Sequence, residues 1–95
     1  MIDRHAQACR RLWASVMLTT LADFNKRHVR ADPDKRPGIL DEARLYLMSK
    51  DGREVAALSG MIIPIDRALK LIASPRDEFR ARTHAKGERW SEEAE

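Results

Sequence analysis

Apolar side chains recur every three or four positions in the first third of the chain, which is the spacing of one face of an α-helix. The members of this stripe are Cys9, Leu12, Trp13, Val16, Met17, Leu21 and Phe24. The pattern predicts a helix from about His5 to His28 that turns this face toward a core. Leu18 lies off the stripe, so the helix either buries a broad face or offers a second apolar strip to a partner.

The segment from Val29 to Gly38 interrupts this pattern. Pro33 and Pro37 each lack an amide donor and favour extended geometry in the residue before them, so we expect a linker of about ten residues. A second helix is predicted from about Ile39 to Met48. The residues of this helix that should face the core are Ile39, Leu40, Ala43, Tyr46 and Leu47.

The stretch from Asp51 to Ile72 has the outline of a helix-turn-helix. Asp51 can cap the start of a third helix, with Glu54 completing a capping box. Gly60 is placed to end that helix, because glycine enters the left-handed region without a Cβ penalty. Pro64 suits the first turn of a fourth helix. One face of this fourth helix carries Ile65, Ala68, Leu69 and Ile72.

The chain beyond the fourth helix offers little apolar surface. Ser74 and Pro75 should stop that helix and cap a fifth, whose single large anchor is Phe79. The sequence therefore predicts an all-α fold, a small four- to five-helix domain with a long first helix and a helix-turn-helix-like half. This domain should cover residues 1–85, and residues 86–95 should form a charged, frayed tail.

Composition and charge narrow the class of protein. Ninety-five residues with 43% hydrophobic and 35% charged content fit one small globular domain. The net charge is +3, and the first 36 residues hold 8 basic and 4 acidic side chains, so the excess lies near the N-terminus. The single cysteine, Cys9, cannot form an intrachain disulfide, which favours a cytoplasmic location. The apolar runs are too short to span a membrane, which needs about 20 residues.

Candidate chemistry is sparse. His5 and Cys9 lie four positions apart and could supply half of a metal site, but the paired ligand spacings of structural zinc sites are missing. The chain lacks a glycine-rich phosphate loop, paired catalytic carboxylates and a serine elbow. We therefore expect no enzymatic activity, no cofactor, no metal and no small-molecule substrate.

The helix-turn-helix outline raises the possibility of DNA binding, in which the second helix would enter the major groove. The side chains expected at bases or phosphates are Arg53, Arg67 and Lys70, with Arg76 and Arg80 as further phosphate contacts. Asp66 would lie on the same reading helix, where a carboxylate opposes phosphate. A plain helical bundle with a glycine corner fits the pattern equally well.

A longer pattern runs through the helical segments: an LW pair in the first helix, then A-R-L-Y-L-x-S-x-D, then V-A-x-L-S-G-M. It is carried by Leu12, Trp13, Ala43, Tyr46, Leu47, Ser49, Asp51, Val55, Ala56, Leu58 and Gly60. This pattern resembles small helical proteins encoded in bacteriophages and prophages, including those of alphaproteobacteria. These are mostly core and capping residues, so the resemblance implies a helical fold more than an activity. Proteins of this kind are commonly uncharacterised or presumed to bind DNA. The apolar segment 62–65 departs from the shorter turn that is usual in that family.

Two functions follow from these features. The leading hypothesis is a small non-catalytic protein, related to phages or prophages, that associates with DNA through the helix-turn-helix-like segment. The alternative is a protein-interaction module or homodimeric adaptor that joins its long first helices or binds a host or phage protein. Residues expected at such a partner surface are Leu18, Ile62, Ile63 and Trp90, because apolar groups beyond a small core usually mark an interaction site.

Overall fold

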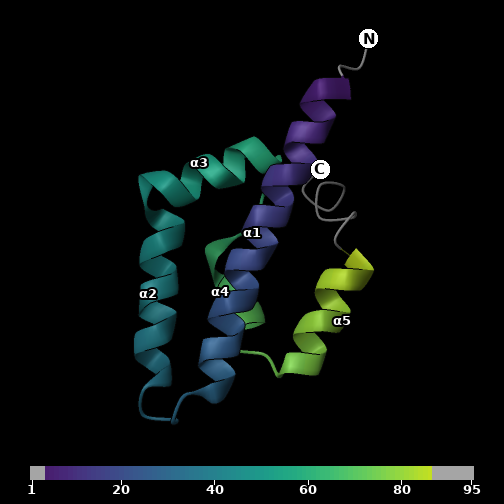
Figure 1. Ribbon diagram of the computed structural model, residues 1–95. Helices are drawn as coiled ribbons and strands as arrows, with labels where there is room; N and C mark the ends of the chain where they lie inside the picture. The colour runs from purple at the N-terminus through teal and green to yellow at the C-terminus, as the bar shows by residue number, and fades with distance from the viewer. Residues whose placement is uncertain (1–3, 87–95) are drawn as a thin grey trace.

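Residues 4–86 are described by the computed structural model, and within that range the chain folds into five helices without a β-strand (Figure 1). The helices are α1 (Arg4–Arg30), α2 (Arg36–Met48), α3 (Lys50–Ser59), α4 (Ile65–Ile72) and α5 (Arg76–Lys86). The predicted all-α class with a long first helix is confirmed. No helix in the described range is long and apolar enough to cross a membrane.

Helix α1 is the axis on which the other helices pack, and only part of its apolar stripe is covered. Met17, Leu21 and Phe24 are buried, as predicted. Leu12 is 62% exposed and Val16 is also exposed, so assigning them to the core was wrong. The first turns of α1 project beyond the other described helices, and too little of the fold is near them to bury a full apolar face (Figure 1).

The connection between α1 and α2 is shorter than the sequence suggested. Helix α1 continues to Arg30 and α2 begins at Arg36, so the predicted ten-residue linker is a five-residue loop, 31–35. Pro37 lies in the first turn of α2, where its missing amide donor costs nothing because those amides have no partner within the helix. The guanidinium of Arg36 donates to the carbonyl oxygen of His28 at 3.2 Å and fastens the loop.

The start of α3 is capped by Ser49 and not by the predicted Asp51. Ser49 has extended backbone angles, and its hydroxyl oxygen accepts a hydrogen bond from the amide of Gly52 at 3.1 Å. Gly52 is fully packed against the end of α2, where a Cβ would overlap the carbonyl oxygen of Tyr46. This close approach sets the sharp corner between α2 and α3.

The corner between α3 and α4 forms at Gly60, as predicted. Gly60 has a φ of 71°, in the left-handed region that favours glycine. Met61 is buried directly after it, and Pro64 precedes α4 and does not lie in its first turn. Helices α3 and α4 each pack mainly on α1 and α2, not on each other. The order of a helix-turn-helix is therefore present without the mutual bracing of its two helices.

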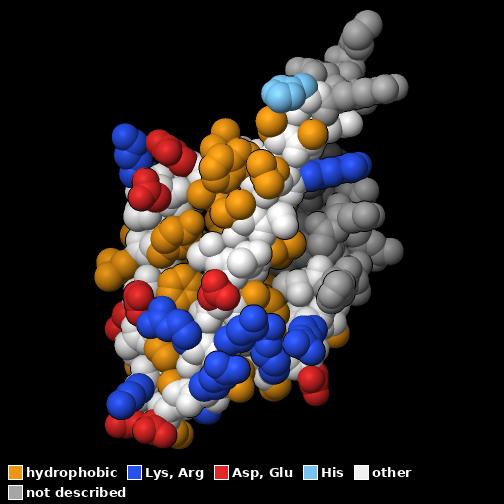
Figure 2. Space-filling model, in the orientation of Figure 1, with side chains coloured by type: hydrophobic (Ala, Val, Ile, Leu, Met, Phe, Trp, Pro, Cys, Tyr) orange, Lys and Arg blue, Asp and Glu red, His pale blue; other side chains and the backbone are white. Residues whose placement is uncertain are grey.

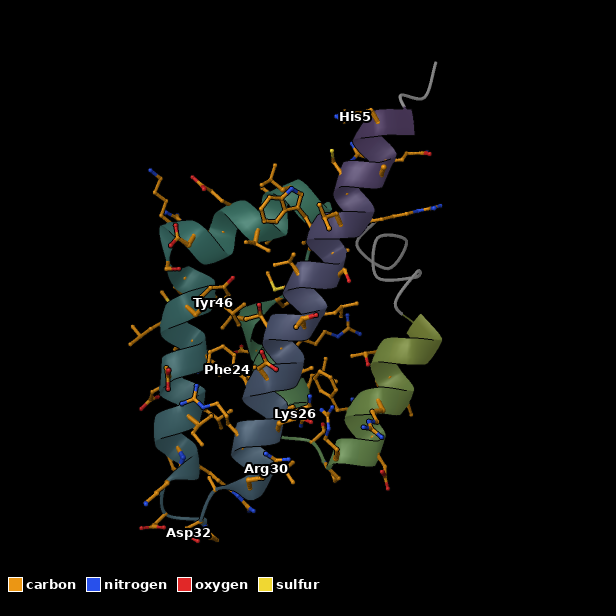
Figure 3. All side chains as sticks on the ribbon, in the orientation of Figure 1. His5, Phe24, Lys26, Arg30, Asp32 and Tyr46 are labelled. Atoms are coloured by element: carbon orange, nitrogen blue, oxygen red, sulfur yellow. The ribbon has the colours of Figure 1, made fainter. Side chains whose placement is uncertain are left out.

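The core lies between α1, α2 and α4. Its buried apolar members are Met17, Leu21, Phe24, Ala43, Met61, Ala68, Leu69, Leu71, Ile72 and Phe79. All five residues predicted to face inward from α2 are buried or packed against this cluster. The rings of Phe24 and Tyr46 meet between α1 and α2 with their centroids 6.3 Å apart (Figure 3). Leu71 is a core residue that the predicted face of α4 omitted.

Helix α5 is held against α1 by Phe79, which is buried as predicted. It ends at Lys86, one residue beyond the predicted domain boundary. Most of the predicted charged tail, including Trp90, lies outside the described residues.

Candidate interaction surfaces

The five cations expected to contact DNA lie in different places. Arg53 lines a groove between α3 and the segment 61–65, and Lys70 lines another between α2 and α4. Arg76 and Arg80 line a third groove, between α1 and α5. Arg67 is exposed on α4. The structure does not bring these side chains together, because the helices that carry them pack on different sides of α1.

The groove that holds Lys70 has mixed charge. Its lining includes the cations Arg44 and Lys70 and the carboxylates Asp41 and Asp66. Two acids opposite two bases cancel most of the attraction that a phosphate would feel. This groove therefore lacks the positive potential of a DNA-binding surface.

The groove between α1 and α5 is more basic. Its lining residues include two arginines and no carboxylate, and its volume is about 310 Å³. Arg76 is half-buried, with its guanidinium 5.5 Å from the centroid of the Phe79 ring and donating to Asn25 at 2.7 Å. Arg80 is exposed and Leu18 is half-buried in the same groove. Arg76 thus serves the packing of α5 as well as the charge of the surface.

Lysine and arginine side chains gather over the C-terminal half of α1 (Figure 2). Lys26 and Arg30 lie there and are exposed (Figure 3). Arg27 is bound by the carboxylate of Glu42 on α2, with N–O distances of 2.6 and 3.2 Å. This hydrogen bond raises the pKa of Arg27 and lowers the pKa of Glu42. The sequence placed the excess charge in the first 36 residues, and the fold exposes it on α1.

A second surface is apolar. We define the α1/α3 patch as Leu12, Trp13 and Val16 of α1 together with Leu58 of α3. Hydrophobic side chains gather where α3 meets the upper half of α1 (Figure 2). Leu12, Val16 and Leu58 are exposed, whereas Trp13 is half-buried. The signal for this patch was present in the sequence, because the apolar stripe of the first helix runs further than a small domain can cover.

A third surface is a concave apolar groove on another side of α3. We define the methionine groove by its lining, which is Met17, Leu47, Met48, Gly52, Arg53, Ala56, Met61, Ile62, Ile63 and Ile65. Its volume is about 470 Å³. Ile62, one of the predicted partner residues, is 70% exposed, and Ile63 is half-buried. Leu18 lines the groove beside α5 instead, so these predicted partner residues do not form one continuous surface.

The histidines and the cysteine do not form a metal site in the described part of the chain. The thiol of Cys9 lies 3.7 Å from Nε2 of His5. Among the described residues, no group of three or more His, Cys, Asp or Glu side chains is placed to hold a metal ion. His28 is buried at the end of α1, where burial and the nearby charge of Arg36 lower its pKa.

Comparisons with known proteins add no family to this description. No family model, curated protein or solved structure matches the chain. The resemblance to small phage-encoded proteins therefore stays a prediction.

Proposed function

We propose that this protein is a non-catalytic interaction module that forms a homodimer through α1. The observation that carries the proposal is the α1/α3 patch, in which large apolar side chains remain exposed on a long regular helix. Exposed apolar groups that gather on one surface of a small domain mark interaction sites. Pairing with a second copy would remove them from water.

The spacing on α1 supports antiparallel pairing. In a two-fold symmetric interface, a residue that contacts a second residue is contacted by it in return. Leu12 and Val16 lie at equal distances from Ala14 along α1, so an antiparallel alignment sets each against the other in the second copy. His5 and Asp23, both exposed, are also symmetric about Ala14, so the alignment would bring an imidazole opposite a carboxylate.

Sedimentation equilibrium across a range of protein concentrations tests this proposal. The wild-type chain should shift from monomer to dimer as concentration rises, and the double variant Leu12→Glu with Val16→Glu should remain monomeric. Leu45→Glu is the matched control, because Leu45 is 71% exposed on α2 and lies outside the patch. A wild-type chain that stays monomeric at every concentration would reject the dimer.

Cross-linking through Cys9 tests the alignment itself. Antiparallel pairing about Ala14 separates the two Cys9 positions by about 15 Å along the helix axis, from the rise of 1.5 Å per residue. A bis-maleimide of matching length should join two copies, and the Leu12→Glu and Val16→Glu double variant should lose the product. Dimers that cross-link only with a very short reagent would contradict this register.

DNA association is a second candidate, supported by the cations over the C-terminal half of α1. Lys26 and Arg30 are exposed there without an ion-pair partner among the described residues, and Arg80 lies on the neighbouring helix α5. Such a surface would hold phosphates without reading bases, so binding would be insensitive to sequence and would weaken steeply with salt.

Fluorescence anisotropy with a labelled mixed-sequence duplex separates this surface from the helix-turn-helix-like half. The double variant Lys26→Gln with Arg30→Gln should weaken binding and reduce the salt slope by about 0.9 for each phosphate that the variant no longer neutralises. The comparison variant Arg53→Gln with Arg67→Gln should bind as wild type does. The reverse ranking would assign DNA binding to α3 and α4, and absence of binding at low salt would exclude both surfaces.

A further inference from the structure

The methionine groove lies where the chain passes from α3 to α4. The four residues 61–64 make this crossing without helical structure. Met17 and Met61 are buried and form the floor, whereas Met48 and Ile62 stand exposed at the rim. A volume of about 470 Å³ lies within the size range of ligand-binding clefts.

The chemistry of the lining limits what could enter. Three of the four methionines of the chain, Met17, Met48 and Met61, line this one groove. Methionine side chains are flexible and polarisable, and concave surfaces rich in them accept the apolar faces of varied helices. Polar ligands and the phosphates of nucleic acid would gain little from such a lining.

One charged side chain in the lining indicates which charge a ligand of the groove should carry. Arg53 is the only charged residue that lines the groove, it is exposed, and it has no ion-pair partner among the described residues. A guanidinium at the edge of an apolar groove favours a ligand that carries a carboxylate beside its apolar groups.

We propose that the methionine groove binds an amphipathic α-helix of a protein partner. Large apolar side chains spaced three or four positions apart would enter the groove, and a carboxylate on the same helix would pair with Arg53. This spacing is how a helix presents one apolar face to a groove. The protein would then act as an adaptor that uses one surface for a second copy and another for a partner.

This site is separate from the proposed dimer surface. Arg53 and Leu58 are five positions apart on α3, so they point about 140° apart around the helix. The α1/α3 patch and the methionine groove therefore lie on different flanks of α3. Partner binding does not depend on dimer formation, and each can fail without the other.

Selection from a phage-displayed library of randomised helical peptides tests the proposed partner chemistry. Peptides selected by the wild-type chain should share apolar residues at i and i+3 or i+4 together with an Asp or Glu. The charge-reversed variant Arg53→Glu should bind these peptides about tenfold more weakly, the size expected for a charge pair at an interface. Arg67→Glu is the matched control, since Arg67 is exposed on α4 outside the groove.

Methyl NMR of methionine-labelled protein locates the bound peptide. The signals of Met17, Met48 and Met61 should shift on addition of a selected peptide, and Ile62→Ser should reduce these shifts. Selected peptides without an acidic residue, equal binding by Arg53→Glu, or unmoved methionine signals would each overturn the proposal. Met17 follows Val16 of the proposed dimer surface, so the signals of Met48 and Met61 are the ones that separate the two surfaces. Shifts of Met48 and Met61 produced by protein concentration alone, or by duplex DNA, would also overturn the proposal, by assigning the groove to a second copy or to nucleic acid.

Discussion

The side-chain oxygen of Asn25 accepts a hydrogen bond from Arg76 at 2.7 Å, although 51 positions separate the two residues. The side-chain nitrogen Nδ2 of Asn25 donates to the backbone carbonyl oxygens of Ile72 and Ser74 at 2.9 and 2.8 Å. Carbonyl groups at a helix end lack partners within the helix, so Asn25 satisfies the end of α4 while it fixes the first residue of α5. One fully buried side chain therefore joins α1, α4 and α5.

Replacing Asn25 should destabilise the fold. Asn25→Ala would leave two carbonyl groups and one guanidinium without their present partner, which should lower the free energy of unfolding by about 2–3 kcal/mol. Urea denaturation measures this change. A double-mutant cycle with Arg76→Ala should give a coupling of about 1 kcal/mol between the two residues. Strictly additive effects would show that the hydrogen bond between them contributes nothing to stability.

The glycines of α2 and α3 should respond to alanine in opposite ways. Gly52→Ala would drive a Cβ into the carbonyl group of Tyr46, so the backbone at the end of α2 must move. This change should lower the free energy of unfolding by about 2 kcal/mol or more. Gly38 has open space around it in α2, so Gly38→Ala should raise stability by about 0.5–1 kcal/mol through helix propensity. Thermal and urea unfolding of the two variants check these signs. Equal effects would contradict the packing at the corner between α2 and α3.

Stability should fall as the pH drops toward 5, and His28 is the cause. Its pKa in the folded chain lies below the ordinary value of 6.5, because the site is buried and near Arg36. The unfolded chain therefore binds the proton more readily than the folded chain. The stabilisation that depends on neutral His28 is fully present above about pH 6.5 and is lost as the pH falls. Urea unfolding of His28→Gln should show a flatter dependence in this range.

Glu42 provides the control for that experiment. Arg27 holds the pKa of Glu42 below 4.5, so its contribution is present above that value and is lost at lower pH. Glu42→Gln should leave the dependence between about pH 5 and 7 unchanged and alter it only in stronger acid. A variant of Glu42 that flattened the higher range would contradict the assignment to His28.

Removing the ring of Phe79 should loosen α5 before the rest of the domain. Phe79 is the only large apolar residue that α5 buries, and α5 packs chiefly on α1. Phe79→Ala should lower the free energy of unfolding by about 3–4 kcal/mol if α5 unfolds together with the whole domain. The loss should be smaller if α5 opens alone. Hydrogen exchange distinguishes these cases, and we expect faster exchange in α5 with little change in α2. Uniform acceleration across all helices would show that α5 is not a separate unit.

The helices themselves were largely predictable from sequence, because helix formation depends on residues a few positions apart. The three-and-four spacing predicted α1 and the inward face of α2, and Gly60 marked the end of α3. Helix ends were less predictable. Ser49 and Asp51 are both good capping residues, and the approach of Gly52 to the end of α2 favours Ser49.

Periodicity by itself determined which face of α1 is apolar, but it could not determine how much of that face is covered. The exposure of Leu12 and Val16 depends on where α3 crosses α1, and the role of Asn25 depends on carbonyl groups 47 and 49 positions away. The separation of Arg53, Lys70 and Arg80 into three grooves follows from the same packing. Local spacing in the chain thus specified the helices, whereas contacts between distant residues decided which surfaces remain free to bind a partner.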